Sequence, residues 1–196
     1  MRARYWAATS GAALLLAVAF QPWLTRSMSL HMLLHIPLIV LSGFGAARAL
    51  VERAGAACWL SGLGARYAKY NEYGIPGLLL CNLVAAYWMI PKSLDEVLVS
   101  ASANGLKYLG LFIAGMVLCD SLRRANSVIM VFFLGNFSWM TAIVGLLYQD
   151  NPQRLCNFYL LGDQEIAGRG LVIIAILVPL AWLVSERRRI RQFLGQ

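Results

Sequence analysis

Residues 28–50 read MSLHMLLHIPLIVLSGFGAARAL, a nearly continuous apolar run that ends close to Arg48. A helix needs about 20 mainly apolar residues to cross a lipid bilayer, and this run meets that length. The run also holds the two histidines of the chain, His31 and His35, within its first turns. The stretch therefore predicts a membrane-spanning helix with a polar feature at one end.

The rest of the chain has the composition of a multi-pass membrane protein. Of its 196 residues, 60% are hydrophobic and 13% are charged, and the mean hydropathy is +0.65. Such values lie outside the range of soluble domains. We expect an all-α integral membrane bundle of six transmembrane helices, forming one polytopic domain over 1–196 with no separate soluble domain. The apolar runs cover 6–24, 28–50, 73–90, 99–118, 128–148 and 170–184.

The basic residues predict the orientation of this bundle. Cytoplasmic loops are enriched in Lys and Arg. Most Lys and Arg residues of this chain fall at the two termini and in the second and fourth loops, whereas the loops on the opposite side have only Arg26, Lys92, Arg154 and Arg169. Both termini are therefore expected in the cytoplasm, and His31 and His35 near the outer surface. The net charge of +8 follows from this topology and from attraction to anionic lipid, so it does not imply nucleic-acid binding.

The two histidines belong to a helical stripe that suits a soft metal ion. At 100° per residue, Met28, His31, Met32 and His35 share one face. Imidazole and thioether ligands favour copper, especially Cu(I). Two histidines one turn apart cannot ligate a haem from both sides, and the chain has no third histidine. The alternative is that the methionines are packing residues and the histidines are interfacial polar groups.

Lys107 is the most unusual residue of the predicted fourth span. It lies about 9 Å inside the outer boundary by helix rise, where a charge costs at least about 2.5 kcal/mol. Asn104, Lys107 and Tyr108 share a face that we expect to turn toward the histidines. The alternative is that Lys107 extends to Asp95 or Glu96 as a structural ion pair.

Outside the spans, residues 149–169 predict the one sizeable external loop, and Lys92–Glu96 predicts a second, short one. The cysteines Cys58, Cys81, Cys119 and Cys156 form no CxxC pair. Cys156 alone is expected on the outer side, where it is either packed and unpaired or a metal ligand. The sequence contains no nucleophile–base pair, carboxylate dyad, phosphate-binding loop or quinone-type motif, so an enzyme is not expected.

Three segments resemble one family. The segments are His31–His35, Trp88–Pro91 followed by Leu94–Leu98, and Asp163–Gly168, which reads DQEIAG. In order and position they resemble the polytopic CtaG family of cytochrome c oxidase assembly factors, from about residue 28 to the end of the last helix. The resemblance implies a bacterial inner-membrane protein that handles copper for a haem-copper oxidase subunit, with His31 and His35 as ligands and Asp163 as a further candidate.

The chain departs from the family pattern near this site. The family's fourth span carries its own pair of histidines, whereas this chain has Asn104 and Lys107 or Tyr108 there. An ammonium group beside two imidazoles repels a cuprous ion. Two functions therefore stay open: a copper-binding or copper-relaying assembly factor, and a metal-free scaffold or accessory subunit of a respiratory membrane complex.

Overall fold

The computed structural model describes residues 2–54 and 63–194, so Cys58 lies outside the described residues. Within these ranges the chain forms helices and connecting loops, in agreement with the predicted all-α class. The elements are α1 (Arg2–Ala19), α2 (Gln21–Leu24), α3 (Met28–Leu30), a π-helical turn η1 (His31–His35), α4 (Ile36–Ala54), α6 (Leu63–Tyr70), a 3-10 turn η2 (Glu72–Gly74), α7 (Ile75–Trp88), α8 (Pro91–Val99), α9 (Ala101–Arg124), α10 (Ser127–Asp150) and α11 (Leu161–Leu194).

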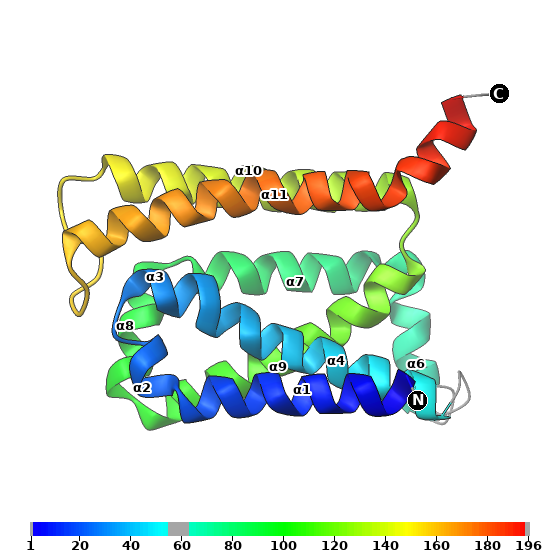
Figure 1. Cartoon of the computed structure of the whole chain (residues 1–196), viewed down its shortest axis with the longest axis horizontal. Coiled ribbons are helices and arrows are strands. Elements are labelled where there is room, and N and C mark those ends of the chain that lie inside the picture. The colour runs from blue at the N-terminus through cyan, green and yellow to red at the C-terminus, as the bar shows by residue number, and fades with distance from the viewer. Residues whose placement is uncertain (1, 55–62, 195–196) are drawn as a thin grey trace.

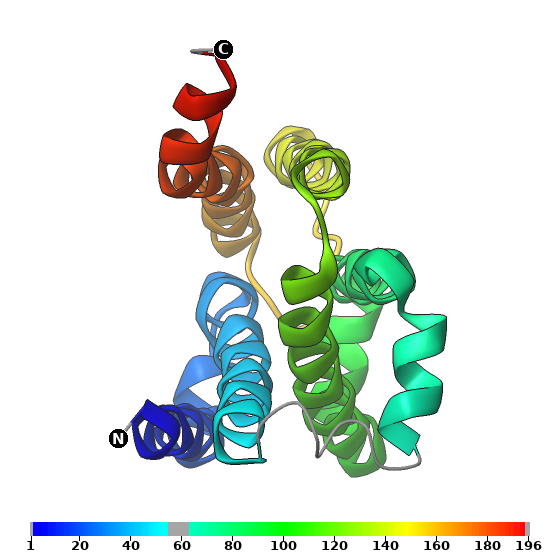
Figure 2. The same cartoon turned by 90° about the vertical axis from the view of Figure 1, so that its right-hand side faces the viewer.

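The long helices run along one common axis (Figure 1). α1 packs on α4, α4 packs on α9, and α9 packs on α7, while α10 and α11 form a hairpin above them. Figure 2 shows this hairpin on one side of the bundle and α1 and α4 on the other. The two ends of the chain lie at the same end of the bundle, and α3 lies at the opposite end.

Four helices are long and apolar enough to cross a membrane: Met28–Arg53, Ala101–Arg124, Ser127–Asp150 and Leu161–Glu186. Glu72–Trp88 and Pro91–Val99, which are bent by 74°, make a fifth if they count as one broken span. α1, which covers most of the first predicted span at 6–24, is not among them because Arg2, Arg4 and several small residues lower its hydropathy. The described part of the chain is thus compatible with a multi-pass membrane protein of four or five spans, whose exposed apolar side chains contact lipid.

The histidine-bearing helix is not a regular α-helix. Residues 31–35 form a π-helical turn between α3 and α4. Pro37 follows this turn and has no N–H to donate to the carbonyl of Leu33, so the regular ladder cannot continue through it. The wider turn carries His31 and His35 on one buried face. π-turns of this kind often occur at functional sites.

Two glycine-lined crossings bring helices into close contact. At the α4–α9 crossing, a Cβ on Gly43 would lie 2.0 Å from the carbonyl oxygen of Phe112, and one on Gly115 would lie 2.1 Å from that of Val40. At the α10–α11 crossing, Gly145 and Gly168 face each other: a Cβ on Gly145 would lie 2.7 Å from the carbonyl oxygen of Gly168, and one on Gly168 would lie 2.5 Å from that of Gly145. Small residues at such crossings are typical of membrane helix pairs.

Both predicted outer loops differ from the sequence-based expectation. Lys92–Glu96 is helical and belongs to α8, because Pro91 starts a helix whose residues Leu94 and Val97 are buried one turn apart. The predicted 149–169 loop shrinks to residues 151–160, because α10 extends to Asp150 and α11 begins at Leu161. The polar residues Asp163 and Gln164 lie in α11, where their side chains bond to α3 and to α10.

Candidate functional site: a buried histidine–lysine–tyrosine cluster

His31 lies at the centre of a buried polar cluster at the α3 end of the bundle. Its side chain is fully buried, its Nε2 lies 3.3 Å from Lys107 Nζ, and its Nδ1 lies 2.8 Å from Tyr159 Oη. An ammonium group can only donate, so we assign the acceptor role to Nε2 and the proton to Nδ1, which donates to Tyr159. His31 thus joins α9 to the loop between α10 and α11.

His35 faces a different set of partners. Its Nε2 lies 3.1 Å from the carbonyl oxygen of Ala17 and 2.9 Å from Tyr108 Oη. A carbonyl only accepts, so Nε2 carries the proton and Nδ1 keeps a lone pair. That Nδ1 is buried and has no hydrogen-bond partner within the described residues. Ala17 lies in the last turn of α1, where helix carbonyls lack intrahelical donors.

Lys107 turns inward, as its helical face predicted. The side chain is fully buried, and its Nζ also lies 5.2 Å from the centre of the Tyr108 ring. The predicted alternative of an ion pair with Asp95 or Glu96 is not found among the ion pairs of the described residues. Asp95 instead accepts hydrogen bonds from the backbone and side-chain nitrogens of Asn157, at 2.8 Å and 3.0 Å.

Asp163 serves as a cap for a helix in the arrangement described. Its carboxylate accepts hydrogen bonds from the backbone N–H groups of Met28 and Ser29 and from the Ser29 hydroxyl, the last at 2.7 Å. A carboxylate at this position satisfies the free N–H groups of α3 and complements the helix dipole. Its oxygens are therefore already bonded, in contrast to the expectation that Asp163 adds to a metal site.

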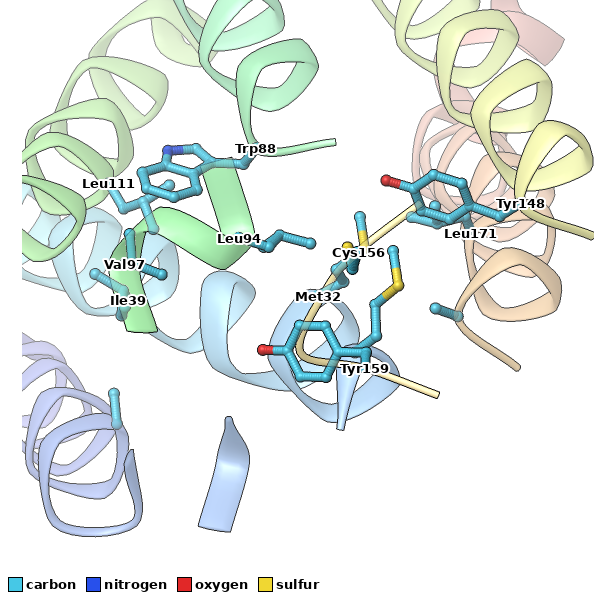
Figure 3. Close-up of a cluster of buried hydrophobic side chains, with 13 residues drawn as sticks. Met32, Ile39, Trp88, Leu94, Val97, Leu111, Tyr148, Cys156, Tyr159 and Leu171 are labelled. Atoms are coloured by element: carbon cyan, nitrogen blue, oxygen red, sulfur yellow. The ribbon is translucent and has the colours of Figure 1, made fainter. Parts of the chain in front are cut away.

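The other predicted site residues occupy the surroundings of the cluster. Met28 and Met32 are buried with the histidines, so this stripe faces the protein interior. Trp88 belongs to the same apolar core as Met28 and Met32, and Figure 3 shows it next to Leu111. Asn104 has a buried Oδ1 without a hydrogen-bond partner in the described part of the chain.

Sequence reasoning missed Tyr159, Ala17 and Gln21 as parts of this cluster. Tyr108 Oη donates to Ala17 O at 2.9 Å and lies 3.1 Å from Gln21 Oε1. Figure 3 shows Tyr159 against the helix that carries Met32. Tyr159 is 128 positions from His31, and no spacing rule could have paired them.

Cys156, in the same loop as Tyr159, is buried, and its Sγ lies 3.6 Å from the carbonyl oxygen of Pro91. Burial, together with the negative charges of Asp95 and Asp163, raises the pKa of this thiol to about 12. A thiol that stays protonated is a poor metal ligand. Of the two expectations for Cys156, the structure favours the packed, unpaired one.

The donor set does not fit a metal ion in the arrangement described. The rings of His31 and His35 are 5.3 Å apart, but the Nε2 of each ring is already hydrogen-bonded. Lys107 places a positive charge against His31. The described residues also contain no group of three or more His, Cys, Asp or Glu side chains placed to hold a metal. Copper ligation by His31 and His35 would require Lys107 to move away.

No protein-family model matches the chain, and no curated protein or solved structure is significantly similar to it. The resemblance to the CtaG family therefore stays an expectation from the three sequence segments. Residues of the third segment have structural contacts: Gln164 bonds to Leu155 and Tyr148, and Gly168 packs on Gly145.

Proposed function

We propose that this chain is a multi-pass protein of a bacterial inner membrane that assists a haem-copper oxidase as a metal-free scaffold or accessory subunit. The observation that supports this proposal is the 3.3 Å contact between Lys107 Nζ and His31 Nε2. The ammonium group occupies the side of the imidazole from which a metal ion would be ligated. In this proposal, the ammonium group of Lys107 is a fixed positive charge inside the bundle.

The membrane arrangement that we propose places both termini in the cytoplasm and the cluster near the periplasmic surface. It counts α1 as the sixth span, since α1 runs alongside α4 over most of its length (Figure 1). The respiratory partner comes from the resemblance to the CtaG family and from no contact in the fold. Buried ionisable residues in membrane helices commonly mark functional positions, which supports a role for the cluster.

A copper-binding or copper-relaying assembly factor is the second candidate. Two observations favour it: both imidazoles are buried on one face, and His35 Nδ1 is an unpaired buried acceptor. In this function copper is the cargo, and His31, His35, Met28 and Met32 would receive it after displacement of Lys107.

Copper content separates the two candidates. The purified chain is incubated with Cu(I) under reducing conditions, and bound metal is measured by mass spectrometry. We expect no stoichiometric copper in the wild type. Lys107→Leu should gain about one copper per chain, because it exposes the lone pair of His31 Nε2. Adding His31→Ala and His35→Ala to that variant should remove the copper again.

Lys92→Met is the matched control, since Lys92 is an exposed lysine on α8. Like the wild type, this variant should bind no stoichiometric copper. One copper per wild-type chain, lost on His31→Ala with His35→Ala, would instead establish the copper function. Co-purification of an oxidase at fixed stoichiometry, identified by its haem spectrum, tests the scaffold function directly, and a chain isolated without oxidase would argue against it.

A further inference from the structure

A separate cavity of about 540 Å³ lies between the α10–α11 hairpin and the helices α4, α7 and α9. It extends from Met32 and Trp88 near the histidine end to Met130 and Trp182 toward the other end. Leu171 and Trp182 on α11 both line it, which corresponds to a length of about 16 Å by helix rise. This volume is within the range of cavities that bind small molecules, about 300–1,000 Å³.

The wall of this cavity contains no charged side chain within the described residues, and nearly all of its lining is apolar. A charged ligand is therefore excluded, because its charge would have no partner there. Trp88, Phe133, Phe137 and Trp182 present aromatic rings among the lining residues. The cavity thus selects a neutral, largely apolar ligand, and aromatic rings favour a flat one.

One buried amide lines this apolar cavity. Asn82 on α7 is only 9% exposed and makes no hydrogen bond within the described part of the chain. It lies about 9 Å from Trp88 at the end of α7 by helix rise, well inside the span. Buried polar groups are hydrogen-bonded in most proteins, so the amide indicates a ligand that carries a matching polar atom.

The depth of Asn82 distinguishes between ligands of the membrane. The ester groups of phospholipids lie in the interfacial region, so an acyl chain in this cavity would leave the amide without a partner. A quinone ring is flat and neutral, and its carbonyl oxygens can accept from the amide N–H. We infer that this cavity binds an isoprenoid quinone, with Asn82 donating to a ring carbonyl and the isoprenoid tail lying along the apolar wall. This inference does not depend on the proposed function.

The test is quinone binding by the full chain in lipid nanodiscs. Decylubiquinone is titrated, and binding is followed by quenching of tryptophan fluorescence, since Trp88 and Trp182 line the cavity. Asn82→Leu should weaken binding about tenfold through the lost hydrogen bond. Asn136→Leu is the matched control, because Asn136 is an exposed amide on α10 that does not line the cavity. It should bind as the wild type.

A second variant guards against a folding defect in the first. Ala85→Phe keeps Asn82 but fills the cavity that Ala85 lines, and it should abolish binding. Organic extraction of the chain purified from native membranes should yield quinone. Equal affinities of Asn82→Leu and Asn136→Leu, undiminished binding by Ala85→Phe, or extraction of phospholipid alone would each overturn the inference.

Discussion

Asp163 shows how one side chain can be assigned two different roles. Near two histidines in a predicted metal site, a carboxylate suggests a ligand. In the fold, its oxygens accept from Met28, Ser29 and the Ser29 hydroxyl, and they fix α11 to the first turn of α3. Lys107 follows the main expectation: its side chain turns inward and its partner is His31, whereas the alternative ion pair with Asp95 or Glu96 is not among the ion pairs of the described residues.

Asp163→Ala is expected to lower the free energy of unfolding by about 1–2 kcal/mol, because three donors at the start of α3 lose their acceptor. The measurement is unfolding by sodium dodecyl sulfate in a mild detergent, followed by circular dichroism. Asp150→Ala, at an exposed carboxylate on α10, should change stability by less than about 0.5 kcal/mol. Equal effects of the two substitutions would show that the cap contributes nothing.

The α4–α9 pair positions the cluster, because η1 continues into α4 and Lys107 lies on α9. Gly43 and Gly115 let these helices approach until each position contacts the other backbone. This close crossing brings α9 against α4, and Lys107 Nζ lies 3.3 Å from His31 Nε2. The π-helical turn also positions the cluster, because it determines which face of the helix the two imidazoles occupy.

Gly115→Ala is expected to cost at least about 2 kcal/mol, since its Cβ would meet the Val40 carbonyl at 2.1 Å and backbone atoms cannot swing aside. Gly110→Ala, on the same helix with nothing within 4 Å, should be neutral or slightly stabilising. Thermal unfolding in detergent compares the two. If both variants have the same melting temperature as the wild type, the close crossing is not a constraint on the fold.

The bundle has two ends with different polar chemistry. The histidine cluster and the packed 151–160 loop lie at the α3 end, and a second cluster lies at the other. There the buried Asn71 side chain donates to Asp120 and Ser121, and Arg124 bonds to the same Asp120 carboxylate at 2.7 Å. In the proposed orientation, this second cluster faces the cytoplasm.

Labelling with a membrane-impermeant maleimide tests that orientation in intact cells. Gln153→Cys, exposed in the 151–160 loop, should be labelled above the wild-type background. Glu72→Cys, exposed at the opposite end of the bundle, should be labelled only after the cells are lysed. The reverse pattern would mean that the bundle is inserted the other way up, with the histidines on the cytoplasmic side.

The sequence by itself determined the helical class, the membrane character and the shared helical face of the histidine stripe, because hydropathy and the 3.6-residue period depend only on neighbours along the chain. Four or five helices of the described residues have the length and hydropathy of a span, and α1, which covers most of the predicted span 6–24, is not among them because small residues and two arginines lower its hydropathy. The predicted outer loop was too long, because Asp163 and Gln164 look like loop residues but lie in α11. Only the tertiary structure decided what those polar atoms bond to. Lys107 and Tyr159 meet His31 across 76 and 128 positions of chain, and such contacts arise from helix crossings and loop packing that no local pattern encodes.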